Sequence, residues 1–171
     1  MFRTESQVNV SAPSLHYRKL IKSEKQFEVL RDGQPSAGFL LRDKPKFKGG
    51  RIILGSVHMP MVNGDLAPLF DWMLERTLGF MPTYLFILDG EYWDKGTETE
   101  REILMFHEMC HCDQARDEFG APRFNRATGE PVWRLIGHDI EEFNAVAARY
   151  GEHSEDVRRF AAALKQHASG K

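Results

Sequence analysis

The sequence has few cysteines, no long apolar run and little excess charge, and each absence excludes a class of protein. Only two of the 171 residues are cysteine, Cys110 and Cys112. On a helix, side chains two positions apart point about 200° away from one another, so these two cannot form a disulfide. A disulfide-stapled fold is therefore excluded, and a reducing cytosol is the expected compartment.

Membrane and export signals are also missing from the sequence. No stretch approaches the roughly 20 apolar residues that a membrane-spanning helix requires. Residues 1–30 lack the apolar core of an export signal. The net charge of −2 creates no global field toward nucleic acid or a membrane surface. We expect no membrane partner, and the sequence leaves the oligomeric state open.

The composition that is present is typical of one globular domain. Hydrophobic residues make up 42% and charged residues 28% of a chain long enough to bury a real core. Residues 1–12 are polar and are expected to be flexible, and residues 13–168 are expected to form a single domain. No repeat or linker interrupts them, so the fold class predicted is α+β.

Apolar periodicity and turn residues predict the order of the elements. Five helices are expected, at 13–30, 64–76, 97–114, 139–150 and 154–166. Strands are expected at 37–47, 51–58 and 84–88, the first two joined by a turn at Gly49-Gly50, with a second hairpin within 121–136. Thr97 and Glu100 have the spacing of a capping box, which begins the third helix.

The segment His107-Glu108-Met109-Cys110-His111 lies within that third helix. Positions four apart lie one turn above each other, so both imidazoles can reach one metal ion. Glu108 is placed beside the metal, where it can hold a water instead of binding the ion. The helix is apolar nearly all the way round and is expected to be buried. In the alternative interpretation, His107, Glu108 and His111 satisfy one another without a metal.

A catalytic zinc site needs a third protein ligand and an open fourth position. His138 is the preferred candidate, because ligand-type side chains gather just before a helix at Gly137-His138-Asp139-Ile140-Glu141-Glu142-Phe143. Glu141 or Glu142 is the alternative ligand, and His153 is a further one. Asp139 and Glu142 also fit the N-cap and third position of a capping box, and Asp139 could orient an imidazole.

The His-Glu-x-x-His helix, a hairpin-sized insertion and Gly-His-Asp-x-Glu-Glu-Phe together resemble the phage metallopeptidase family over about residues 15–150. The resemblance implies a zincin-like fold, with a small mixed sheet packed against the active-site helix and helices at the C-terminal end. It implies His107, His111 and His138 as ligands of one Zn²⁺ and Glu108 as general base. By analogy with such folds, the strand at 84–88 would pair with an extended substrate.

These residues predict a zinc-dependent metalloendopeptidase acting on a protein or peptide. Glu108 would take a proton from water and pass it to the leaving amine. Tyr92, Tyr150 and His153 are candidate donors to the developing oxyanion, although a structural role is the simpler interpretation of each.

Two other functions compete with this hypothesis. One is a non-catalytic protein in which zinc stabilises a fold used for binding or regulation. The other is a DNA-associated protease resembling the SprT-like group, for which a basic hairpin with Arg42, Lys44, Lys46, Lys48 and Arg51 would contact phosphates. A solvated strand edge that discourages aggregation is the simpler interpretation of those charges.

Overall fold

The computed structural model describes residues 1–140 and 144–170. They divide into two compact units, Met1–Ile136 and Gly137–Lys171, which are described separately. The mixture of small sheets and helices is that of the α+β class predicted from the sequence. No helix among the described residues is long and apolar enough to cross a membrane.

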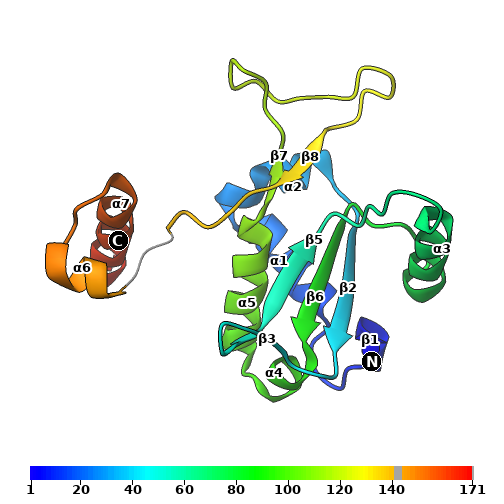
Figure 1. Ribbon diagram of the computed structural model, residues 1–171, viewed down its shortest axis with the longest axis horizontal. Coiled ribbons are helices and arrows are strands. Elements are labelled where there is room, and N and C mark those ends of the chain that lie inside the picture. Colours follow the sequence, from blue (N-terminus) through cyan, green and yellow to red (C-terminus); the bar gives the residue numbers. More distant parts are fainter. Residues whose placement is uncertain (141–143, 171) are drawn as a thin grey trace. The chain divides into compact units, whose positions relative to one another are not determined.

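A four-stranded mixed sheet forms the centre of the first unit (Figure 1). Its strands, in the order in which they lie, are β1 (Phe2–Thr4), β2 (Ala37–Arg42), β6 (Tyr84–Asp89) and β5 (Gly55–His58). β2 and β6 are parallel, whereas β1 pairs with β2 and β5 pairs with β6 in the antiparallel direction. The five apolar residues that open β6 pack alternately into clusters on the two faces of the sheet, which is why the run is apolar at every position.

Helices cover one face of this sheet and build the main core. They are α1 (Pro13–Ser23), α2 (Glu28–Gly33), α4 (Gly90–Lys95) and α5 (Glu98–Cys110), with 3-10 turns η1 (Glu5–Gln7) and η2 (Lys25–Phe27). Alternate residues of β6 point into this core, which also contains Trp93 of α4 and Met105 and Met109 of α5, all fully buried. The helix that carries the histidines is therefore fixed to the sheet through its apolar side.

The opposite face of the sheet is covered by α3 (Ala67–Leu78), which contributes a smaller cluster with Leu74 buried against Leu40 and Leu85. The predicted helix at 64–76 is thus present but shifted by a few residues. Pro68 lies in its first turn, where a missing N–H costs nothing.

Two antiparallel ribbons complete the first unit. β3 (Lys46–Lys48) pairs with β4 (Arg51–Ile53), and β7 (Cys112–Gln114) pairs with β8 (Trp133–Leu135). The predicted turn at Gly49-Gly50 is confirmed, and both glycines have positive φ. Each of the long strands expected at 37–47 and 51–58 is divided into two shorter strands. Between β2 and β3 lies Pro45, which has no N–H to donate to a strand ladder.

Three other boundaries differ from the sequence prediction. The helix expected at 13–30 is broken at Glu24, and the helix expected to reach Gln114 ends at Cys110, where the chain turns into β7. Residues 1–12, expected to be flexible, include β1 paired with β2 and the turn η1. These pairings depend on strands far away in the sequence, so local periodicity could not predict them.

The second unit contains two described helices, α6 (Asn144–Tyr150) and α7 (Glu155–Ala168). The side chain of Ser154 caps α7 by accepting a hydrogen bond from the Val157 amide. Asp139 lies in a bend and α6 is described from Asn144, so the helix start expected at Asp139 is wrong. The proposed partner in that capping box, Glu142, lies outside the described residues.

The hydroxyl of Tyr84 connects the sheet to the β7–β8 ribbon. It lies 3.0 Å from the carbonyl oxygen of Asp113 and 2.9 Å from that of Arg134, to which it donates.

The Tyr84 side chain is buried, so removing its hydroxyl would leave a lost hydrogen bond that water cannot replace. We expect Tyr84→Phe to lower the free energy of unfolding by about 1–3 kcal/mol, measured by urea denaturation. The exposed Tyr150→Phe serves as the matched control, and equal stability of the two variants would contradict this role.

Candidate metal centre

The start of α5 is fixed by hydrogen bonds at its first turn. The Thr97 amide donates to the Glu100 carboxylate at 2.7 Å, and the Glu100 amide donates to the Thr97 hydroxyl at 3.2 Å, which confirms the capping box. The buried Arg101 guanidinium donates to the Trp93 carbonyl at 2.7 Å and pairs with Glu98 at 2.9 Å. The helix is thereby fixed at one end, and the histidines lie at the other.

His111 ends the helix and is bound to the segment that follows β8. The Ile136 amide donates to the carbonyl of His111 at 2.9 Å, and the His111 ring nitrogen Nδ1 lies 2.8 Å from the carbonyl of Ile136. A carbonyl can only accept, so Nδ1 carries the proton in this contact. The lone pair of the neutral ring is therefore on Nε2, the nitrogen available to a metal ion.

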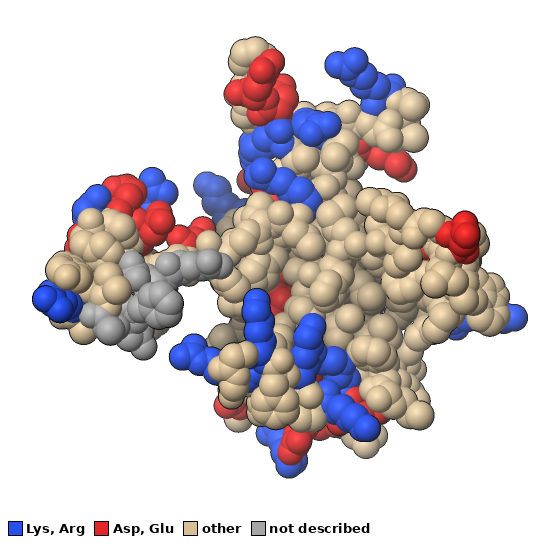
Figure 2. Space-filling model, in the orientation of Figure 1, with Lys and Arg blue, Asp and Glu red and all other residues tan. Residues whose placement is uncertain are grey.

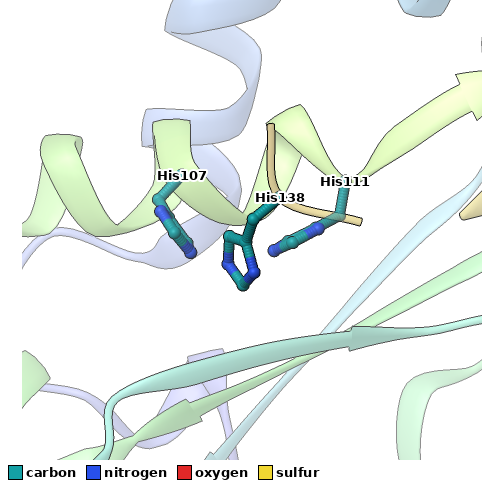
Figure 3. Close-up of side chains that lie close together, drawn as sticks. All are labelled: His107, His111 and His138. Atoms are coloured by element: carbon teal, nitrogen blue, oxygen red, sulfur yellow. The ribbon is translucent and has the colours of Figure 1, made fainter. Parts of the chain in front are cut away.

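The structure brings His107, His111 and His138 together (Figure 3). Each offers one ring nitrogen, and these three atoms all lie within 4.8 Å of one another. The rings of His107 and His111 have centroids 5.3 Å apart, at an interplanar angle of 81°. His138 follows Ile136 by two residues, so the two hydrogen bonds to His111 bring it to the helix.

The geometry of these three nitrogens fits one small divalent cation. Three imidazole nitrogens at zinc distance in a tetrahedral site lie roughly 3.3 Å apart, so binding requires the rings to close by at most about 1.5 Å. His107 and His138 are exposed, and an exposed imidazole turns readily about its terminal torsion. Nitrogen ligands of this kind suit zinc, and three protein ligands leave one position open.

Glu108 lies beside these histidines and is buried, with 4% of its surface exposed. Burial raises the pKa of its carboxyl to about 7, whereas the nearby His111 lowers it. A cation held by the histidines would favour the ionised form further. A buried carboxylate next to a metal ligand set is the arrangement expected of a proton acceptor.

The backbone of β5 lies directly against this carboxylate. A Cβ atom added to Gly55 would lie 2.3 Å from Glu108 Oε1 and 2.7 Å from Cδ. Only glycine lets the strand and the carboxyl approach so closely. The sequence interpretation missed this residue, although a glycine inside a strand is a signal of close backbone approach.

The expectation that α5 is buried on all sides is wrong. Ile103 is 62% exposed, and His107 and Cys110 are exposed along the same side of the helix. Residues at i, i+4 and i+7 share one face, so the apolar Ile103 belongs to the exposed stripe. Composition cannot distinguish which apolar face a helix buries. Cys110 lies on that stripe, whereas Cys112 is buried.

The strand expected to pair with substrate is also corrected. β6 is hydrogen-bonded to β2 on one side and β5 on the other, so it has no open edge. β5 is the terminal strand of the sheet and contacts α5 through Gly55. Which strand lies at the edge of the sheet depends on pairing between distant segments, and local sequence patterns do not reveal that pairing.

The structure leaves the roles of the remaining candidate residues open. Asp139 is exposed, and Glu141 and Glu142 lie outside the described residues. Tyr92 is on α4, packed against the main core. Tyr150 and His153 belong to the second unit, where their ring centroids lie 6.5 Å apart. Their roles stay predictions.

Comparison with known proteins gives one match. A family model described as "Putative phage metallopeptidase" matches residues 11–165, which is most of the chain. No curated protein and no solved structure matches the sequence.

The choice of third ligand can be tested with zinc itself. If His138 supplies it, His138→Ala should weaken zinc binding by at least tenfold, measured by competition with a chromogenic chelator, because two imidazoles hold the ion less firmly than three. His167→Ala, at an exposed position outside the candidate site, is the matched control and should bind zinc as the unaltered protein does. Unchanged affinity in His138→Ala, with loss in Glu141→Gln or Glu142→Gln, would assign the ligand to the acidic pair.

Proposed function

Because this chain belongs to the putative phage metallopeptidase family, we propose that it is a zinc-dependent metalloendopeptidase that cleaves a protein or peptide. The observation that carries this proposal is the convergence of three imidazole nitrogens within 4.8 Å, next to the buried carboxyl of Glu108. A zincin-like arrangement is part of the proposal. The mixed sheet with α5 against it supports that arrangement.

We assign His107, His111 and His138 as the ligands of one zinc ion. Two lie one helical turn apart on α5, and the third comes from the segment after β8. When bound, zinc supplies Lewis-acid polarisation of the scissile carbonyl and lowers the pKa of water. Asp139 and the acidic pair Glu141 and Glu142 remain the alternative source of the third ligand or of a group that orients an imidazole.

Glu108 acts as the general base. It accepts a proton from the attacking water and passes it to the nitrogen of the leaving amine, which balances the charge of both steps. The β5 backbone at Gly55 closes one side of the carboxyl and limits its rotation. Tyr92, Tyr150 and His153 are retained as candidate donors to the oxyanion.

The terminal strand β5 gives an extended substrate a place to bind. Its outer edge has no neighbour in the four-stranded sheet, and main-chain hydrogen bonds to such an edge hold peptides in an extended form. The strand begins at Gly55, against Glu108, so a peptide paired with it would pass the proton acceptor.

A non-catalytic zinc protein is the competing function. Zinc that only stabilises a fold is usually closed by four protein ligands and gains nothing from an adjacent buried carboxyl. Burying Glu108 carries a desolvation cost, which raises its pKa to about 7. A cost of this kind is typical of a functional group and favours catalysis.

Glu108→Gln separates these two functions. We expect zinc affinity close to that of the unaltered protein and loss of peptide hydrolysis by roughly 10²- to 10⁴-fold, because the amide cannot accept the proton. Hydrolysis of a casein or peptide-library substrate, together with metal content, provides both measurements. Cleavage at the original rate in this variant would remove Glu108 from the mechanism.

Gly55→Ala tests the contact between β5 and the base. We expect kcat to fall by roughly 10- to 100-fold with little change in KM or zinc affinity, because the new methyl displaces the carboxyl. Ser56→Ala is the matched control, since the Ser56 side chain bonds His58 on the other face of the strand. If the effect passes through Glu108, Gly55→Ala should cause no further loss in the Glu108→Gln background. Additive losses would assign Gly55 a purely structural role.

A further inference from the structure

The hairpin formed by β3 and β4 concentrates positive charge on one part of the surface. We call residues 44–53 the basic ribbon. Its cationic side chains, all exposed, are Lys44, Lys46, Lys48 and Arg51. Figure 2 shows Lys and Arg gathered on the lower part of the face in view, where Figure 1 places β3.

No acidic side chain within residues 1–140 or 144–170 forms an ion pair with these cations. After Asp43 the next acidic residue in the sequence is Asp65, and Asp43 is already paired with Arg3 at 2.8 Å. The field of the ribbon is therefore opposite in sign to the net charge of −2 on the whole chain.

The ribbon also exposes apolar surface on its other face. Phe47 pairs with Ile52 in register, so their side chains share a face, while Lys46, Lys48 and Arg51 share the opposite one. Phe47 is 62% exposed and Ile52 is 49% exposed. A strand edge that served only to prevent aggregation would not present an aromatic ring to solvent.

The base of the ribbon is firmly held. The buried Arg42 guanidinium donates to the carbonyl of Ile53 at 2.6 Å, and the Asp43 amide donates to the Met1 carbonyl at 3.0 Å. Its charge also reaches the next strand. The pKa of His58 lies below its usual value, first because the ring is partly buried and then because the cations Lys46 and Arg42 are near. The ribbon is thus a fixed cationic projection that continues directly into β5.

We propose that the basic ribbon binds a single strand of nucleic acid that wraps around its edge, with phosphates on the face of the lysines and arginine and an unpaired base folded over to stack on Phe47 on the other face. Cations combined with an exposed aromatic ring are the two components of single-strand recognition. In a duplex the faces of the bases are covered by their neighbours, so Phe47 favours the single strand. An anionic membrane would offer the same charge without a flat ring to stack.

This inference does not depend on hydrolysis, but it adds to the proposed function. β4 ends at Ile53 and β5 begins at Gly55, which contacts Glu108. Nucleic acid held on the ribbon would therefore lie next to the strand that contacts the proton acceptor. The favoured substrates would then be proteins bound to single strands.

The full chain should bind a fluorescein-labelled (dT)20 oligonucleotide, measured by anisotropy. With four cations available, the slope of log K against log salt should be no steeper than about −3. Replacing Lys44, Lys46, Lys48 and Arg51 by Ser should abolish binding. The control variant replaces Arg18, Lys22, Lys25 and Arg76 by Ser, which removes the same charge from exposed positions elsewhere, and it should bind normally.

Phe47→Ser distinguishes stacking from charge alone. It keeps all four cations and should weaken (dT)20 binding by about tenfold. A duplex of the same length and vesicles containing phosphatidylserine should bind more weakly than (dT)20. No binding of (dT)20, equal binding in the ribbon variant, no effect of Phe47→Ser, or a preference for duplex or vesicles would each overturn the proposal. Circular dichroism of each variant excludes loss by misfolding.

Discussion

The candidate site depends on the pair of hydrogen bonds between His111 and Ile136. One joins the main chains at 2.9 Å, and the other joins the imidazole to a carbonyl at 2.8 Å. The first holds the segment after β8 against the end of α5, and the second sets the tautomer of the ring. Without them His138, which is 27 positions away from His111 in sequence, would have no reason to approach the helix. The ligand set therefore depends on the β7–β8 ribbon as much as on the motif.

The sheet contributes the other half of the site. Its terminal strand β5 lies against Glu108 with no side chain between them, and this contact buries a carboxyl whose pKa rises to about 7. The helix supplies two of the proposed metal ligands and the strand limits the rotation of the proposed base, so the position of helix and strand relative to each other is what the core must maintain. Met105 and Met109, both fully buried on the side of α5 that faces the core, fix that position.

Local sequence predicted the parts of this structure that local chemistry determines. The capping box at Thr97, the glycine turn at 49–50 and the apolar strand β6 all follow from short-range patterns and are confirmed. The family was also predicted from the two motifs, and the match over residues 11–165 confirms it. Strand order, the exposed stripe of α5 and the contact of Gly55 with Glu108 were not predictable, because each depends on which distant segments pack together. His138 was chosen from sequence as the third ligand. The structure places it with His107 and His111, while the acidic alternatives Glu141 and Glu142 lie outside the described residues.

The central claim is that one ion is held by imidazole nitrogens alone, next to a carboxyl that does not bind it. X-ray absorption at the zinc edge measures this coordination directly in the zinc-loaded protein. The account predicts three imidazole nitrogens and one further light atom at about 2.0–2.1 Å. A sulfur at about 2.3 Å would place a cysteine on the metal, and failure to take up one equivalent of zinc would contradict the account entirely.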